Sequence, residues 1–161
     1  MKFTVIGTGY VGTSLSVLLS TFYDVIAYDI NKNNVKKINQ RKSPIKDKYI
    51  EKFLKHRELN LKASSIKEKA LRDSDYVIIC TPTNYDTKNN TFDTTSVDKS
   101  IKDIRKINKK AIIVIKSTVP IGYTKNMREK YKYEDIFFSP EFLRETKALY
   151  DNLYPSRIIV G

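Results

Sequence analysis

Residues 2–12 read Lys-Phe-Thr-Val-Ile-Gly-Thr-Gly-Tyr-Val-Gly, and the fold can be worked out from this stretch. A short apolar run typical of a β-strand leads into the spacing G-x-G-x-x-G. In that spacing Gly7 allows a tight turn, Gly9 lets the backbone approach a pyrophosphate, and Gly12 lets the following helix pack close to the strand. The phosphates would lie on free amides at the helix N-terminus. The predicted cofactor-binding residues of the turn are Gly7, Gly9, Tyr10, Val11 and Gly12.

The residues after Gly12 indicate whether the glycine spacing marks a nucleotide-binding turn. A second strand is predicted over residues 24–28, and it ends in Asp29. An acidic residue at this place accepts hydrogen bonds from the adenosine ribose and repels a 2′-phosphate, which favours NAD over NADP. The alternative is a glycine-rich turn followed by an acidic helix cap. The nucleotide interpretation is favoured because a helical pattern joins the two strands, with apolar residues at Val11, Leu15, Leu18, Leu19 and Phe22.

Composition narrows the class of protein. A chain of 161 residues with 40% apolar content can bury one core and is expected to form one domain. It contains no apolar run of the ~18 residues that a membrane span needs, and no leader precedes the first strand. A single cysteine excludes a disulfide framework, so a cytoplasmic protein without a membrane partner is expected.

The net charge of +12 comes from 30 basic and 18 acidic residues, a balance that can indicate a nucleic-acid partner. The lysines are scattered along the predicted helices, and no nucleic-acid recognition motif accompanies them. We therefore expect solvated helix faces and a small anionic ligand, with no nucleic-acid partner.

Strands and helices alternate along the rest of the chain. Strongly apolar strands that alternate with helices predict an α/β fold, a doubly wound parallel sheet of Rossmann type. A polar loop is predicted after the strand over 76–80, up to residue 90. The helix that begins at Ser64 is expected to be capped by that serine. The expected helices cover 31–40, 47–57, 64–72, 94–108 and 124–131, and the further strands cover 59–63, 76–80, 111–115 and 136–138.

Pro82, Pro120 and Pro140 each follow shortly after a predicted strand. In a doubly wound sheet these strand ends open on one crevice, where ligands bind. The prolines alone could simply end the strands, but they also fix the paths of the loops beside them. The polar residues that these loops would present to the crevice are Thr83, Thr118, Glu141 and Glu145.

Glu141 and Glu145 follow Ser139 and Pro140, which suit the cap and first position of a helix. In a helix the spacing i, i+4 would place both carboxylates on one face beside the crevice, available as a general base and a polar anchor. The alternative is that they only favour the helix dipole. His56, between two basic residues, is expected to be solvated, and no cluster has metal-ligand spacing.

Taken together, the motifs resemble the N-terminal domain of the UDP-glucose 6-dehydrogenases, in the UDP-glucose/GDP-mannose dehydrogenase family. The resemblance covers the whole chain. The segments that carry it are 7–12 (GTGYVG), 81–83 (TPT), 116–122 (KSTVPIG), 139–145 (SPEFLRE) and 150–157 (YDNLYPSR).

The resemblance implies an oxidoreductase of nucleotide-sugar metabolism that oxidises the C6 hydroxyl of UDP-glucose in two NAD-dependent steps, through an aldehyde and an enzyme-bound thioester. Thr118, with Glu141 or Glu145, would position the water that hydrolyses the thioester. The residues implied to contact NAD are Val11, Asp29, Thr83, Thr118 and Glu145. Those implied to contact the UDP-sugar are Glu141, Phe142, Leu143, Arg144, Glu145 and Tyr150.

The chain departs from the family pattern after the second strand. Members often carry a basic residue a few positions after the acid, and in this chain Lys32 is a candidate for that place. Residues 1–161 are expected to be the NAD-binding domain alone, inactive by itself. The nucleophilic cysteine, its assisting lysine and asparagine, and the second domain of a homodimeric full-length member would lie beyond Gly161. Cys80 cannot replace that nucleophile, because it falls in a buried apolar strand where a thiolate is disfavoured.

Other readings remain open at this stage. Within the family, the chain can belong to a GDP-mannose or a UDP-N-acetylhexosamine dehydrogenase, although residues 83–85 and 152–155 favour UDP-glucose. Outside the family, it can be a stand-alone NAD-binding or regulatory module without catalysis.

Overall fold

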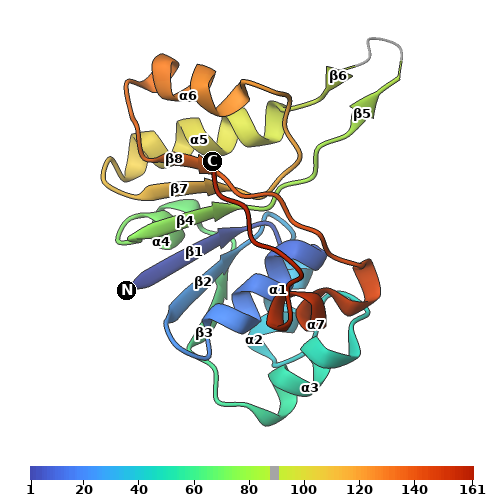
Figure 1. Ribbon diagram of the computed structural model, residues 1–161. Helices are drawn as coiled ribbons and strands as arrows, with labels where there is room; N and C mark the ends of the chain where they lie inside the picture. Colours follow the sequence, from blue (N-terminus) through green and yellow to red (C-terminus); the bar gives the residue numbers. More distant parts are fainter. Residues whose placement is uncertain (88–90) are drawn as a thin grey trace.

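A computed structural model describes residues 1–87 and 91–161 of the chain. Its centre is a six-stranded parallel sheet in the order β3-β2-β1-β4-β7-β8, with helices on both sides (Figure 1). Because β1 and β4 lie side by side at the middle of the sheet, the chain reverses its winding direction between them. A doubly wound sheet binds ligands at this switch point, at the carboxyl ends of the strands.

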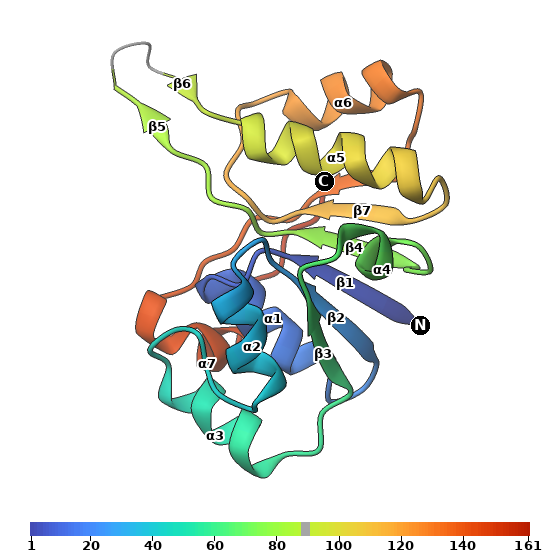
Figure 2. The same ribbon diagram turned by 180° about the vertical axis from the view of Figure 1, so that it is seen from behind.

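The strands are β1 (Lys2–Ile6), β2 (Asp24–Tyr28), β3 (Leu61–Ser64), β4 (Tyr76–Ile79), β7 (Ile112–Ile115) and β8 (Ile136–Phe138). The helices are α1 (Tyr10–Leu19), α2 (Lys32–Asn39), α3 (Lys48–His56), α4 (Lys67–Leu71), α5 (Thr95–Ile107), α6 (Tyr123–Tyr131) and α7 (Ala148–Leu153), with a 3₁₀ turn at Glu145–Lys147 before α7. A small antiparallel hairpin of β5 (Tyr85–Asp86) and β6 (Thr91–Phe92) projects from the body of the molecule (Figure 2).

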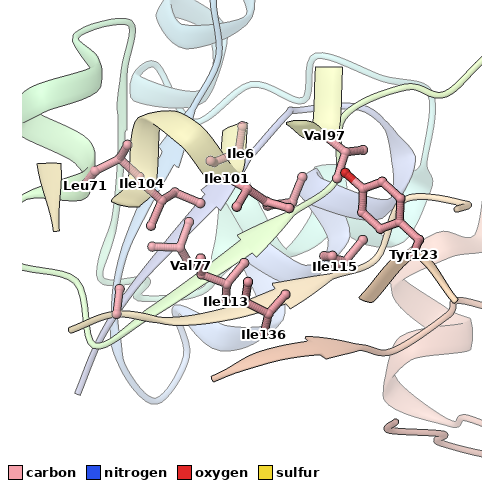
Figure 3. Packing of buried hydrophobic residues seen from close by; sticks show 12 residues of the cluster. Ile6, Leu71, Val77, Val97, Ile101, Ile104, Ile113, Ile115, Tyr123 and Ile136 are labelled. Atoms are coloured by element: carbon pink, nitrogen blue, oxygen red, sulfur yellow. The ribbon is translucent and has the colours of Figure 1, made fainter. Parts of the chain in front are cut away.

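Successive side chains of β4 enter different cores, as the alternation of a strand requires. Val77 and Ile79 belong to the larger cluster, in which α4, α5 and α6 pack on one face of the sheet (Figure 3). Ile78 belongs to the cluster on the other face, beside Val5, Val25 and α1. With both faces covered, the strands can be almost wholly apolar.

Behind α1, helices α3 and α7 close the first half of the domain. The buried carboxylate of Asp47 joins them: Oδ1 accepts from the amides of Tyr49 and Ile50 and caps α3, while Oδ2 accepts from the Leu149 amide at 3.2 Å. The Asn152 amide of α7 also donates to Ser14 Oγ of α1 at 2.8 Å. These bonds bring the end of the chain back against the helix that follows the glycine turn.

The doubly wound α/β fold predicted from the sequence is confirmed, and each expected strand is present within a few residues. The expected apolar face of the first helix was wrong at Phe22, because α1 ends at Leu19 and the Phe22 side chain is 74% exposed. The expected serine cap was also wrong: α4 begins at Lys67, and Ser64 Oγ instead accepts from the Ile66 amide in the turn before it.

The helix expected to start at Pro140 is not formed. Residues 139–144 are without regular structure, and only a 3₁₀ turn follows at Glu145–Lys147. The polar loop expected up to residue 90 holds the hairpin, and its residues 88–90 lie outside the described residues. Within the described parts of the chain, no helix combines the length and apolar character needed to cross a bilayer.

Candidate nucleotide-binding cleft

A cleft of about 1000 Å³ lies at the carboxyl ends of the strands. Its walls come from the loops after β1, β2, β4, β7 and β8 and from one side of α5. The volume is at the upper end of the range for small-molecule sites, as a dinucleotide requires. The sequence-predicted residues that line it are Gly7, Gly9, Tyr10, Val11, Asp29, Thr83, Thr118, Glu141, Leu143 and Glu145.

The glycine turn forms the floor of the cleft. Gly7 adopts φ +95, and a Cβ there would meet the Cys80 carbonyl oxygen at 2.5 Å. A Cβ on Gly12 would lie 1.9 Å from the Gly7 carbonyl oxygen, so α1 can approach the turn only because residue 12 is glycine. A Cβ on Gly9 would meet nothing within 4 Å, since this residue faces the open cleft at the start of α1. The space that a side chain would fill there is the space a pyrophosphate needs.

Asp29, directly after β2, is held by the loops around it. Its Oδ2 accepts from the backbone amide of Thr8 at 2.8 Å and from the Thr8 hydroxyl, and its Oδ1 accepts from the Asn31 amide at 2.8 Å. The Asn34 side-chain amide donates in turn to Thr8 Oγ1 at 3.1 Å. The carboxylate is therefore fixed at the edge of the cleft, where an adenosine ribose is expected.

Beyond Asp29 the cleft continues between α4 and α5. There Lys67 and Asp103 form an ion pair of 2.5 Å, and their hydrogen bond raises the pKa of Lys67. The neighbouring Tyr28 hydroxyl has a raised pKa, chiefly because it is partly desolvated. Ile30, 84% exposed, supplies an apolar surface at the same end. An apolar wall beside hydrogen-bonding groups suits a planar base.

The opposite end contains Thr118, Glu141 and Glu145 together with Lys116, which the sequence analysis did not select. Lys116 Nζ donates to the Pro140 carbonyl at 3.1 Å and to Ser139 at 3.4 Å, so it joins the end of β7 to the loop that carries Glu141. Burial lowers the pKa of Lys116. A lysine directly after an apolar strand is a sequence signal that could have indicated its place in the cleft.

Cys80 lies just after β4 rather than inside it, and it lines the cleft. Burial raises the pKa of its thiol to about 12, so at neutral pH the group is a thiol and not a nucleophilic thiolate. The argument against Cys80 as a nucleophile therefore holds, although its position is closer to the cleft than expected.

Hydrogen bonds tie the loops of the cleft to one another. Ser96 Oγ, at the start of α5, donates to the Pro82 carbonyl at 2.8 Å and accepts from the Thr81 hydroxyl, whose oxygen lies 2.9 Å away. Ser117 Oγ donates to the Thr81 carbonyl at 2.6 Å, so the loop after β7 holds the loop after β4. Thr83 and Thr118 are thereby carried on connected loops, which limits their motion.

Among the described residues, several predicted site residues lie outside this cleft. Gly12 is buried beneath the turn. Phe142 is exposed under the Arg157 guanidinium, which lies 4.2 Å from the ring centre. Arg144 is exposed and forms an ion pair of 2.6 Å with Asp151.

Tyr150 also points elsewhere, because its ring lies between those of Tyr49 and Tyr154, with centroids 5.2 and 5.0 Å away. Lys32 and His56 are exposed on their helices, outside the cleft lining. For Phe142, Arg144 and Tyr150 a substrate contact remains a proposal.

The fold and the cleft define a class: a dinucleotide-binding domain of Rossmann type, with a glycine turn under the phosphate position and an acid at the end of β2. The sequence model described as "UDP-glucose/GDP-mannose dehydrogenase family, NAD binding domain" matches residues 1–161. The chain belongs to this family and corresponds to its NAD-binding domain.

Known relatives agree with this assignment. The chain is 56% identical over 161 residues to a UDP-glucose 6-dehydrogenase of Streptococcus pneumoniae, covering 100% of the chain and 41% of the relative. It is 50% identical over 163 residues to a UDP-glucose 6-dehydrogenase of Campylobacter jejuni, covering 100% of the chain and 42% of that relative. The chain thus spans about two-fifths of the length of these relatives.

Solved structures give the same fold. A GDP-mannose dehydrogenase from Pseudomonas aeruginosa matches with a TM-score of 0.87 at 28% identity, over 100% of this chain and 41% of that chain. A UDP-glucose dehydrogenase from Pyrobaculum islandicum matches with a TM-score of 0.85 at 28% identity, over 99% and 40% of the two chains.

Proposed function

We propose that the chain is the NAD-binding part of a UDP-glucose 6-dehydrogenase, which converts UDP-glucose to UDP-glucuronate. The observation that carries the choice of sugar nucleotide is the 56% identity to a UDP-glucose 6-dehydrogenase, against 28% to the GDP-mannose dehydrogenase of nearly the same fold. The match covers the whole chain, including the loops that form the cleft.

The described residues suit NAD. The amides at the start of α1 would receive the pyrophosphate over Gly9, where the turn leaves open space. Asp29 would accept from the adenosine ribose, and Ile30 would cover one face of the adenine. Thr83, Thr118 and Glu145 would then lie along the nicotinamide half, and bound NAD would supply the hydride acceptor.

Thr118, Glu141 and Glu145 are proposed to act on the sugar. Each lines the cleft: Thr118 and Glu141 lie on the loops after β7 and β8, and Glu145 begins the 3₁₀ turn before α7. A carboxylate near a hydroxyl can hold and deprotonate a water molecule, which is the requirement of the hydrolytic step. Lys116 would keep Glu141 in place through its bond to the Pro140 carbonyl.

The test joins this chain to the remaining part of the Streptococcus pneumoniae relative, in place of the segment it matches. NADH formation is then followed with UDP-glucose, GDP-mannose and UDP-N-acetylmannosamine. We expect turnover with UDP-glucose, and a loss of about a hundredfold or more in kcat for Glu141→Gln or Glu145→Gln. Glu129→Gln, on the exposed side of α6, is the matched control and should keep full activity.

The 161-residue chain alone should bind NAD and form no NADH, because the nucleophile and half of the sugar site are proposed to lie in the part beyond it. Steady NADH formation by the isolated chain would contradict this division of the machinery. If the joined protein preferred GDP-mannose, GDP-mannose would replace UDP-glucose as the proposed substrate.

A further inference from the structure

The feature that the NAD-binding role leaves unexplained is the set of protein donors around Asp29. The Thr8 side chain is 1% exposed, although Thr8 lies in the glycine turn at the edge of the cleft. Its hydroxyl donates to Asp29, so its remaining capacity is that of an acceptor, which the Asn34 amide fills at 3.1 Å. Asn34 of α2 thus donates to Thr8 of the glycine turn, and Thr8 donates to Asp29 at the end of β2.

The carboxylate of Asp29 has about four acceptor positions. The Thr8 amide and hydroxyl occupy two of them on Oδ2, and the Asn31 amide occupies one on Oδ1. One position on Oδ1 remains for a ribose hydroxyl. Asp29 is thus held in one orientation before any ligand arrives, which lowers the entropic cost of binding.

Three backbone amides at the start of α2 are likewise bonded to protein acceptors. A helix N-terminus ordinarily offers free amides to a phosphate. Here the amide of Asn31 donates to Asp29, and the amides of Asn33 and Asn34 donate to the Asn31 side chain at 2.9 and 3.3 Å. A 2′-phosphate placed beside Asp29 would therefore meet a fixed negative charge and no free amide at these positions.

We propose that Thr8 and Asn34 are specificity-determining residues, which enforce the choice of NAD over NADP by fixing Asp29. They are positioning residues, and the inference rests on the proposed contact between Asp29 and the adenosine ribose. With the hydroxyl of Thr8 removed, Asp29 can turn away from the cleft. The ribose of NAD then loses its hydrogen-bond acceptor, and the 2′-phosphate of NADP is no longer repelled by the carboxylate. The ratio of the two affinities changes, which a general loosening of the fold does not produce.

The test measures the Kd of the 161-residue chain for NAD and for NADP by calorimetry, at one fixed salt concentration. Thr8→Val keeps the shape and the backbone amide but removes the hydroxyl. We expect NAD affinity to fall about tenfold, the effect of about one hydrogen bond to a charged group, with NADP affinity changed by less than about threefold. Thr8→Ser should restore the wild-type ratio.

Asn34→Ala should change the ratio in the same direction by a smaller factor. Because Asn34 is only half-buried, this variant keeps the test usable if Thr8→Val does not fold. Asn33→Ala is its control, because Asn33 is an exposed neighbour on the same turn of α2. Thr13→Val is the control for Thr8→Val. It removes another buried hydroxyl, bonded to the Thr8 carbonyl at 2.8 Å, and should lower Tm without changing the ratio.

Equal losses for both dinucleotides would show a structural role only and would overturn the inference. Tighter NAD binding by Thr8→Val would also overturn it, because the hydroxyl would then compete with the ribose for Asp29. A wild-type chain that binds neither dinucleotide would contradict the NAD-binding function itself, so the two failures are distinguishable.

Discussion

Gly12→Ala is the substitution that tests the geometry of the glycine turn most sharply. In an ordinary helix this change stabilises by roughly 0.5–1 kcal/mol, because alanine restricts the unfolded chain. Here the new Cβ would lie 1.9 Å from the Gly7 carbonyl oxygen and 2.9 Å from its carbon, both backbone atoms. Real Cβ atoms stay at least 3.0 Å from other heavy atoms. To lengthen the 1.9 Å contact to 3.0 Å, α1 would have to move by about 1.1 Å.

A shift of that size separates α1 from β1 and from α7, which α1 contacts along its buried face. Overpacking of this kind costs about 1–3 kcal/mol, and we expect the upper end because no side-chain rotamer can relieve a backbone contact. For a domain of this size such a loss lowers Tm by about 6–12 °C.

The measurement is urea denaturation followed by circular dichroism, with Gly9→Ala as the matched control. The Cβ of Gly9→Ala meets nothing within 4 Å, and its φ of −75 is accessible to any residue. We expect this control to lose no more than about 1 kcal/mol, the cost of alanine at a helix cap. If Gly12→Ala were as stable as the control, the close packing of α1 on the turn would be refuted.

Other predictions concern stability away from the cleft. Asn108→Ala should lower the unfolding free energy by about 2–4 kcal/mol, because the buried Asn108 side chain bonds two carbonyls and two amides. Asn126→Ala, at an exposed position, is the control and should change it by less than about 0.5 kcal/mol. Equal urea midpoints for the two variants would contradict this prediction. Gly122→Ala should cost about 1–2 kcal/mol, since Gly122 has φ +81, and an unchanged Tm would argue against that conformation. The hydrogen bond from Arg144 lowers the pKa of the Asp151 carboxyl, so its stabilisation is present above the unfolded pKa of about 3.9 and is lost as pH falls through the lower native value. Arg144→Gln should flatten this acid limb of the Tm curve, and an identical limb in both proteins would contradict the assignment.

The parts of the fold that follow from local sequence could be predicted. The glycine spacing, the acid of Asp29 and the apolar strands are each signalled by neighbouring residues, and the order of the elements then determines the sheet. The cleft residues that lie directly after strands, such as Thr83, Thr118 and Glu141, followed from the same rule.

The remaining features depend on contacts between distant segments, which no local pattern contains. The serine and proline at 139 and 140 match a helix start, but Lys116 binds the Pro140 carbonyl and the segment stays irregular up to the 3₁₀ turn. Asp47, which caps α3, also accepts a hydrogen bond from the Leu149 amide, 102 residues away. The Thr8 and Asn34 bonds around Asp29 likewise require the folded arrangement of β1, β2 and α2.

Calorimetric titration of the 161-residue chain with NAD tests directly whether NAD binds over the glycine turn. Gly9→Val is the decisive comparison, because the structure has open space at Gly9 and the variant should fold, yet its side chain would occupy the pyrophosphate position. We expect one NAD bound per wild-type chain and none by Gly9→Val, with the Tm of the variant lowered by no more than about 4 °C. Equal NAD affinity in the two proteins would contradict this expectation.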